Sequence, residues 1–213
     1  MKKIIIIFDF DGVILKSHTI KARAFYELFK MFGKTKAVEA QQYHLSKAGI
    51  SRFKKFNYIK KNILRNIKIK NKELNIIFRK YCLKRILKMK IDKRLLYFLQ
   101  TYHKKMEFYI STGSPQREIN EILKKKKLHH YFHGIYGSPS NKVEHIKKIK
   151  KKNAKIIFIG DSQDDIFAAK KTNTNFLLRI HTQNRNQFYN TNIKKLYNYS
   201  NLMSKINNVI KNC

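Results

Sequence analysis

Five of the six aspartates in the chain fall in two short stretches, and each stretch directly follows an apolar run. Asp9 and Asp11 follow "IIIIF", and Asp161, Asp164 and Asp165 follow "KIIFIG". Carboxylates on separate loops are hard oxygen ligands of the kind that Mg²⁺ accepts, together with water and substrate phosphate. An aspartate can also attack phosphorus and form an aspartyl-phosphate. The two stretches therefore indicate metal-dependent phosphoryl transfer.

Two further strand ends could bind a phosphate group. Thr112 and Gly113 follow "EFYIS", and Lys142 lies at a predicted helix start, six residues beyond Tyr136. The Thr112 hydroxyl and backbone N–H groups at helix starts can bind phosphate oxygens, while Lys142 offsets their charge. Ser111 is the alternative hydroxyl, and the position of Thr112 immediately before Gly113 favours Thr112.

Asp11 has a different predicted role from Asp9. It could protonate a leaving alkoxide and later deprotonate the attacking water. Gly12 permits the tight backbone path that brings both aspartates to one site.

These residues lie together only if the strands before them run parallel in one sheet, since ligands gather beyond the carboxyl ends of such strands. Apolar runs predict strands at residues 4–8, 107–111, 134–136, 155–160 and 175–180. Single helices are predicted between the last four, the first of them capped by Ser114 and beginning at Pro115. This alternation predicts an α/β fold with a doubly wound, parallel, Rossmann-like sheet.

Nearly a hundred residues without a convincing strand separate the first two strands. They contain helical patterns at 19–32, 52–64 and 72–87, and Asp92 is predicted to cap a helix that returns the chain to the sheet. We therefore expect an α/β catalytic core at residues 1–15 and 89–213, with an inserted all-helical cap at 16–88. Residues 181–198 are polar and aperiodic, and 201–210 are expected to form a closing helix.

The stretch "HLSKAGISRFKKF" (44–56) contains the best candidate for a substrate contact in the cap. Arg52 follows a polar loop and a capping Ser51, so it could bind an anionic substrate group. The alternative is a solvated arginine on a capped helix.

The net charge of +35 does not by itself predict a nucleic-acid site. The basic residues are 39 lysines and 9 arginines, accompanied by 29 isoleucines and 19 asparagines, which together suggest an A/T-rich coding bias. Phosphate-binding and base-reading surfaces usually rely on arginine. We expect a solvated lysine surface with no specific nucleic-acid partner, and keep polyanion binding as the weaker alternative.

The chain shows no membrane-spanning pattern, since no stretch approaches roughly 20 apolar residues. The apolar run in "MKKIIIIFDFDG" is shorter than the roughly 7 to 15 residues of a signal peptide core. Cys82 and Cys213 provide no disulfide framework, which favours a reducing, cytoplasmic location.

Four stretches of the chain resemble the motifs of the haloacid dehalogenase superfamily, in the same order. "FDFDGVI" is similar to the first motif, "FYISTGSP" to the second, "SPSNKVEHI" to the third and "IIFIGDSQDDIFAA" to the fourth. The first and fourth are specific, whereas the second and third are weak alone.

The resemblance implies a role for each matched residue. Asp9 is the nucleophile and a ligand of Mg²⁺ together with Asp161, and Asp11 is the acid and base, which would also lend its carbonyl to the metal. Thr112 and Lys142 would hold the phosphate. Asp165 would order the water around the metal, although it and Asp164 could instead complement the dipole of a helix start.

The same resemblance implies that a helical cap between the first two motifs selects the substrate. Asp11 favours an oxygen leaving group, because superfamily members that release halide lack an acid at this position. We expect a monomeric or homodimeric Mg²⁺-dependent phosphatase of a small phosphorylated metabolite, such as a sugar phosphate. A phosphomutase with the same residues is the alternative, and a non-catalytic polyanion-binding protein is a weaker one.

Overall fold

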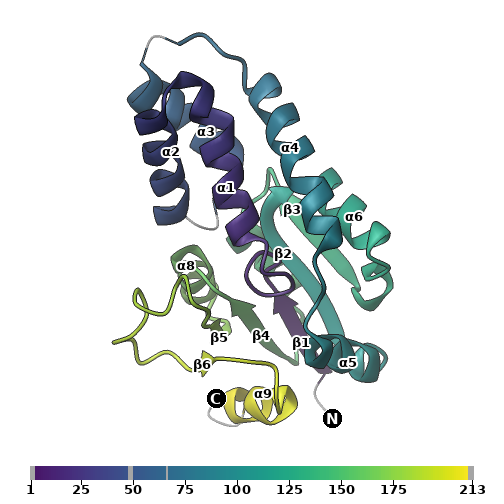
Figure 1. The fold of residues 1–213 in the computed structure, drawn as a ribbon. Coiled ribbons are helices and arrows are strands. Elements are labelled where there is room, and N and C mark those ends of the chain that lie inside the picture. The colour runs from purple at the N-terminus through teal and green to yellow at the C-terminus, as the bar shows by residue number, and fades with distance from the viewer. Residues whose placement is uncertain (1–2, 48–49, 66, 211–213) are drawn as a thin grey trace. The chain divides into compact units, whose positions relative to one another are not determined.

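The computed structural model describes residues 3–47, 50–65 and 67–210 (Figure 1). The chain forms two compact units. The α/β unit comprises Met1–Leu15 and Lys90–Cys213, and the helical unit comprises Lys16–Met89.

The α/β unit is built on a six-stranded, entirely parallel sheet with the order β3-β2-β1-β4-β5-β6. Its strands are β1 (Lys3–Phe8), β2 (Glu107–Pro115), β3 (Gly134–Ser138), β4 (Ala154–Gly160), β5 (Asn175–Arg179) and β6 (Lys195–Leu196). Its helices are α5 (Lys93–Tyr102), α6 (Gln116–Lys125), α7 (Lys142–Ile149), α8 (Gln163–Lys171) and α9 (Leu202–Ile210), with a short 3₁₀ turn at His129–Tyr131. The predicted α/β class and parallel sheet are confirmed.

The central strand β1 is buried on both faces, which explains its uninterrupted apolar sequence. Ile5 and Ile7 face a core shared with Ile146 of α7 and Ala168 of α8. On the other face, where Phe108 lies, Phe98 of α5 stacks on that ring with centroids 5.6 Å apart. Helices therefore cover both faces of the sheet, as in a doubly wound fold.

The helical unit contains α1 (His18–Phe29), α2 (Lys34–Ser46), α3 (Arg52–Ile59) and α4 (Asn71–Lys88). A 3₁₀ turn at Lys30–Phe32 extends α1, and a π-helical turn at Lys60–Leu64 extends α3. Buried phenylalanines fill its core, with the Phe56 ring 5.7 Å from Phe25, 6.4 Å from Phe29 and 6.1 Å from Phe78.

Several local predictions differ from the structure. No predicted helix corresponds to α2, whose buried positions are only the small residues Ala37 and Ala40. The two-residue strand β6 lies in the segment predicted to be aperiodic. Ser114 does not cap α6: β2 continues through Pro115, which stands at the N-cap position without a side-chain cap. The caps predicted at Ser51 and Asp92 are confirmed.

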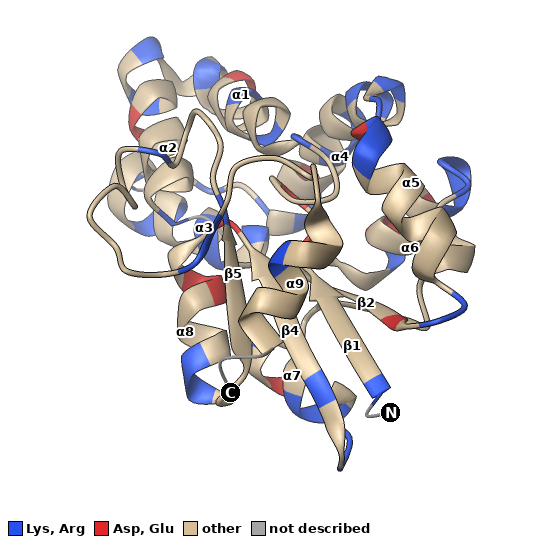
Figure 2. Ribbon diagram, turned by 90° about the horizontal axis from the view of Figure 1, so that it is seen from below, with Lys and Arg blue, Asp and Glu red and all other residues tan. Residues whose placement is uncertain are grey.

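Lysine and arginine lie on helices of both units, whereas acidic segments are few (Figure 2). No helix in the described part of the chain is both long and apolar enough to cross a membrane.

The phenylalanine core of the helical unit predicts a large loss of stability for Phe56→Ala. This change should lower the free energy of unfolding by about 3 to 5 kcal/mol, because it leaves a cavity among three other rings. Phe167→Ala is the control, since that ring is 60% exposed and its loss should cost about 0.5 kcal/mol or less. Urea unfolding followed by circular dichroism measures both, and equal losses would contradict the assignment of Phe56 to a packed core.

Candidate active site

Three carboxylates meet at the carboxyl edge of the sheet. β1 and β4 are neighbouring strands, with Phe8 opposite Ile159, and Asp9 and Asp161 directly follow them. One carboxylate oxygen from each of Asp9, Asp161 and Asp165 lies within 4.8 Å of the other two. We call these three side chains the carboxylate cluster. Parallel pairing of adjacent strands thus brings together residues far apart in sequence, as predicted for strand ends.

Lys142 supplies a buried positive charge beside two members of the carboxylate cluster. It is the first residue of α7, where Asn141 and Glu144 form a capping box. Its Nζ atom lies 2.5 Å from Asp165 Oδ1 and 3.2 Å from Asp9 Oδ1. Burial opposes the charged form, but Asp165 and Asp9 outweigh burial and raise the pKa of Lys142. The ammonium group is therefore a fixed positive charge between the two carboxylates.

Asp165 organises the loop between β4 and α8. Its Oδ2 atom accepts hydrogen bonds from the amides of Asp161 and Ser162 at 3.1 and 3.0 Å, and from the Ser162 hydroxyl at 2.6 Å. Gly160 leaves space for this side chain, because a Cβ atom there would lie 2.4 Å from Asp165 Cβ. Asp165 thus combines a capping-box role at the start of α8 with the ion pair to Lys142.

The charge balance of the carboxylate cluster fits a bound cation. Burial raises the pKa of Asp9 well above its usual value, and Asp165 and Asp161 reinforce the shift against the opposing effect of Lys142. Burial and Asp165 likewise raise the pKa of Asp161. Asp9 Oδ1 is buried and accepts no well-aligned hydrogen bond, despite the nearby ammonium of Lys142. Buried oxygens that repel one another are suited to bind a hard divalent ion.

Asp11 lies in a tight turn next to Asp161. The Gly12 amide donates to the Leu15 carbonyl at 2.7 Å, and Gly12 has a φ of +84°. A Cβ atom on Gly12 would lie 1.9 Å from Asp161 Oδ2, so only glycine allows this approach. The Asp11 carboxylate accepts a hydrogen bond from Ser114 Oγ at 3.3 Å. Within the described residues, Asp11 does not join the carboxylate cluster.

The two candidate hydroxyls of β2 have different partners. Ser111 Oγ lies 3.0 Å from Nδ1 of the buried His145. Thr112 Oγ1 accepts a hydrogen bond from the Ser114 amide at 3.2 Å. Gly113 is partly exposed between these buried residues. The Ser111 hydroxyl is therefore already paired with a residue of α7, which leaves Thr112 as the better candidate for a phosphate-binding hydroxyl.

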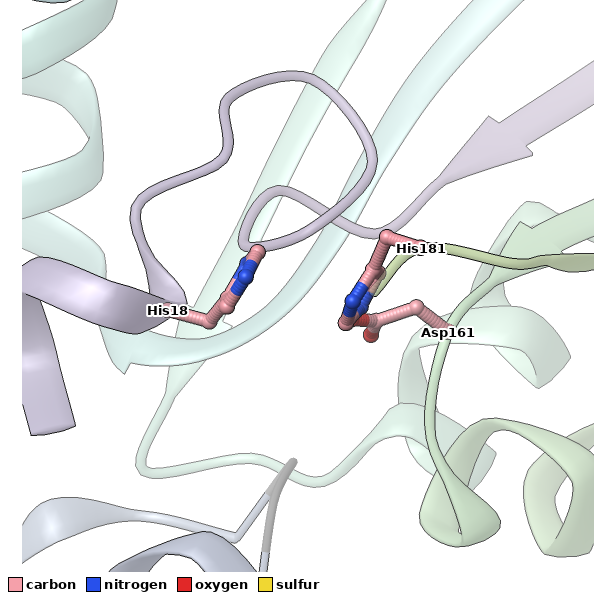
Figure 3. A group of neighbouring side chains, drawn as sticks. All are labelled: His18, Asp161 and His181. Atoms are coloured by element: carbon pink, nitrogen blue, oxygen red, sulfur yellow. The ribbon is translucent and has the colours of Figure 1, made fainter. Parts of the chain in front are cut away.

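His181 also reaches the site, although it is not among the predicted site residues. Its Nε2 atom lies 2.8 Å from Asp161 Oδ2, as Figure 3 shows. Asn184 joins the two loops, because its side-chain amide donates to the carbonyls of Asp161 and Arg179 at 2.8 and 2.9 Å. His181 directly follows the predicted strand 175–180. Asp9 and Asp161 also directly follow predicted strands, so this shared position could have identified His181 as a site residue.

Arg52 lies in the helical unit, where it is the first residue of α3. Ser51 caps this helix by accepting from the Phe53 amide. The Arg52 side chain is buried, with Nη1 3.3 Å from Asn75 Oδ1 and the guanidinium carbon 4.5 Å from the centre of the Phe78 ring. The alternative of a solvated arginine is therefore wrong, because the side chain is buried, and the substrate contact by Arg52 stays a prediction.

The sequence profile of the haloacid dehalogenase-like hydrolases matches residues 6–179. This match extends from β1 to the end of β5 and includes every member of the carboxylate cluster. No curated protein matches the chain in a sequence comparison.

Solved structures share the fold along almost the whole chain. A β-phosphoglucomutase from Clostridium difficile is 20% identical with a TM-score of 0.73, over 99% of this chain and 100% of the other. A haloacid dehalogenase-like hydrolase from Streptococcus pneumoniae is 20% identical with a TM-score of 0.69, over 95% and 98%. A predicted phosphoglycolate phosphatase from Haemophilus somnus is 15% identical with a TM-score of 0.69, over 96% and 98%.

The four matched stretches, the parallel sheet and the carboxylates at its edge agree with the profile match. The chain belongs to the haloacid dehalogenase-like hydrolase family.

Proposed function

We propose that this protein is a Mg²⁺-dependent phosphatase of a small phosphorylated metabolite, acting through an aspartyl-phosphate. The observation that carries this proposal is the burial of Asp9 beside Lys142 and Asp161. A carboxylate can approach a phosphoryl dianion only where positive charge offsets their repulsion, and Lys142 provides such charge 3.2 Å from Asp9.

In the first step, an Asp9 oxygen attacks phosphorus and the bond from phosphorus to the ester oxygen breaks. Asp11 donates a proton to the departing alkoxide, so the product leaves as a neutral alcohol. In the second step, Asp11 removes a proton from water, the water oxygen attacks phosphorus, and the bond from phosphorus to the Asp9 oxygen breaks, which releases inorganic phosphate and restores the Asp9 carboxylate. Ser114 would orient Asp11 through the hydrogen bond to its Oδ2 atom.

The phosphoryl oxygens would be bound by the Lys142 ammonium, the Thr112 hydroxyl and the backbone at Gly113. Thr112 and Lys142 are both buried, so their interactions with phosphate would be little screened by water. The geometry of β2 supports this choice over Ser111, whose hydroxyl pairs with His145.

The carboxylates of Asp9 and Asp161, with the backbone carbonyl of Asp11, would hold the Mg²⁺ ion. When bound, the ion supplies positive charge that favours the ionised carboxylates and neutralises the phosphoryl oxygens. Asp165 would not bind the ion directly, because Lys142 and the loop amides already occupy its oxygens. It would instead order the water around the metal.

We propose that the helical unit is the substrate-selecting cap. Three of its cationic side chains, Lys21, Arg52 and Lys55, are buried. The burial of His44, together with these charges, lowers the pKa of His44 well below its usual value. Such a unit suits a substrate with an anionic group in addition to the reacting phosphate. We also propose a cytoplasmic location, which rests on the cysteine content alone.

A phosphomutase is the second candidate, because it would use the same residues and a β-phosphoglucomutase shares the fold. The two are separated by product: a phosphatase releases inorganic phosphate, whereas a mutase returns the phosphoryl group to another hydroxyl. A screen of phosphorylated metabolites for phosphate release, with and without Mg²⁺, tests the proposal. A polyanion-binding role is disfavoured by the complete carboxylate cluster.

Asp9→Asn should abolish phosphate release, with a loss of more than about a thousandfold in kcat, because an amide is a poor nucleophile. Asp92→Asn is the matched control, since asparagine also caps helices and turnover should persist. Circular dichroism checks that both variants fold. Near-normal turnover by folded Asp9→Asn protein would rule out the covalent mechanism.

Asp161→Ala should sharply raise the Mg²⁺ concentration needed for activity, or abolish activity, because a carboxylate ligand is lost. It should also remove most of the rise in Tm that Mg²⁺ gives the wild-type protein. Asp164→Ala is the control, three residues along the chain and outside the carboxylate cluster. The metal assignment fails if turnover is insensitive to EDTA and to Asp161→Ala.

Arg52→Ala should reduce kcat/KM about tenfold or more for the true metabolite and little for a small aryl phosphate. The loss corresponds to one charge-assisted contact of about 1.5 to 3 kcal/mol. Arg85→Ala is the matched control, because Arg85 also stacks on a ring of α4, that of Tyr81, but is exposed. Equal losses on both substrates would instead assign Arg52 to packing within the helical unit.

A further inference from the structure

The turn that carries Asp11 is closed by its own backbone. The Phe10 carbonyl accepts hydrogen bonds from the amides of Ile14 and Leu15 at 2.9 and 3.1 Å. The Gly12 amide donates to the Leu15 carbonyl at 2.7 Å. These bonds fix the shape of the turn but do not attach it to the rest of the sheet. The attachment matters, because a general acid must stay within hydrogen-bond reach of the leaving oxygen.

Tyr199 attaches this turn from a distant part of the chain. Its hydroxyl donates to the Val13 carbonyl at 2.5 Å. Tyr199 is only 4% exposed and Val13 only 3%, so water competes little for this bond. Burial raises the pKa of Tyr199 to about 12, against the opposing effect of Arg179. The hydroxyl therefore keeps its proton at neutral pH and can act as the donor to Val13.

The Tyr199 ring is held in turn by the end of β5. The guanidinium carbon of Arg179 lies 5.0 Å from the centre of the ring. Arg179 Nη1 donates to the carbonyls of Leu196 and Tyr197 at 3.2 and 2.7 Å, and Leu196 pairs with Arg179 in the sheet. Arg179 and Tyr199 are both buried. The position of the ring is thus set by the sheet and not by an exposed loop.

Asp11 and Asp9 differ in what holds them. Ser114 Oγ donates to Asp11 Oδ2 at 3.3 Å, while Tyr199 holds the backbone two residues beyond Asp11. Asp9 has its own attachment, because its amide donates to a carbonyl of β4 at 2.8 Å. Loss of the Tyr199 hydroxyl should therefore displace Asp11 more than Asp9.

We propose that Tyr199 is a positioning residue for Asp11, and that its hydroxyl holds the turn where Asp11 can protonate the leaving oxygen. This inference rests on the acid role of Asp11 in the proposed function. A misplacement of about 1 Å can cost on the order of a hundredfold in rate. The cost should depend on the leaving group, because a group that is stable as an anion needs the proton least.

The test compares kcat/KM of the full protein, at saturating Mg²⁺, for phenyl phosphate and p-nitrophenyl phosphate. The two esters are similar in shape, but phenolate is the poorer leaving group. Tyr199→Phe should lower kcat/KM about tenfold or more for phenyl phosphate and less than about threefold for p-nitrophenyl phosphate. Asp11→Asn should show the same preference with larger losses. Tyr197→Phe is the matched control, since that ring is 56% exposed, and it should equal the wild type on both esters.

Equal losses on both esters would overturn the inference, because Tyr199 would then support the fold or the whole site. No loss on either ester would overturn it as well. If the wild type releases phosphate from neither ester, or if Asp11→Asn affects both equally, the proposed function fails and the inference fails with it.

Should Tyr199→Phe not fold, replacement of Tyr199 by 4-aminophenylalanine decides the question. Its amino group keeps a donor at the same end of the ring, but a weaker one than a phenol. A loss confined to phenyl phosphate supports the inference, whereas an equal loss on both esters, or no loss, overturns it.

Discussion

The candidate site depends on one buried ion pair network, in which the Lys142 ammonium lies between Asp9 and Asp165. Removing such charges from water is costly, and the cost is recovered only where the geometry satisfies them well. Here α7 provides the cation at its capped first residue, while the capping box of α8 holds Asp165 with three further donors. The network thus joins the ends of β1 and β4 to the starts of two helices. It also places Asp9 next to a positive charge while the Asp9 side chain stays buried.

Much of this arrangement could be predicted from the sequence, because strand ends in a parallel sheet share one edge. The apolar runs before Asp9, Thr112 and Asp161 were sufficient to predict the sheet, and a coding bias toward lysine made the few aspartates informative. His181 escaped prediction although it directly follows the predicted strand 175–180, because it begins a polar segment that has no acidic residue nearby in the sequence. Its importance depends on a contact with Asp161 that only the folded loops create.

The remaining differences have local physical causes. α2 buries two alanines and no large apolar residue, so its sequence lacks the periodic stripe that identifies a helix. The serine and proline before α6 look like a helix start, yet β2 continues through them and Ser114 binds Asp11 instead of a helix amide. Substrate identity is the least predictable property, because the fold is shared at 20% identity or less by the mutase and phosphatase structures compared above.

The raised pKa of Lys142 has a consequence for how the protein responds to acidity. This group keeps its proton throughout the range in which carboxylates and histidines exchange theirs. It therefore acts as a permanent counter-ion and not as a proton carrier. Any change of turnover between mildly acidic and neutral solution must then originate in groups other than Lys142, such as the carboxylates, the histidines or the substrate phosphate, and a pH profile of this hydrolase reports on those groups without interference from the nearest cation.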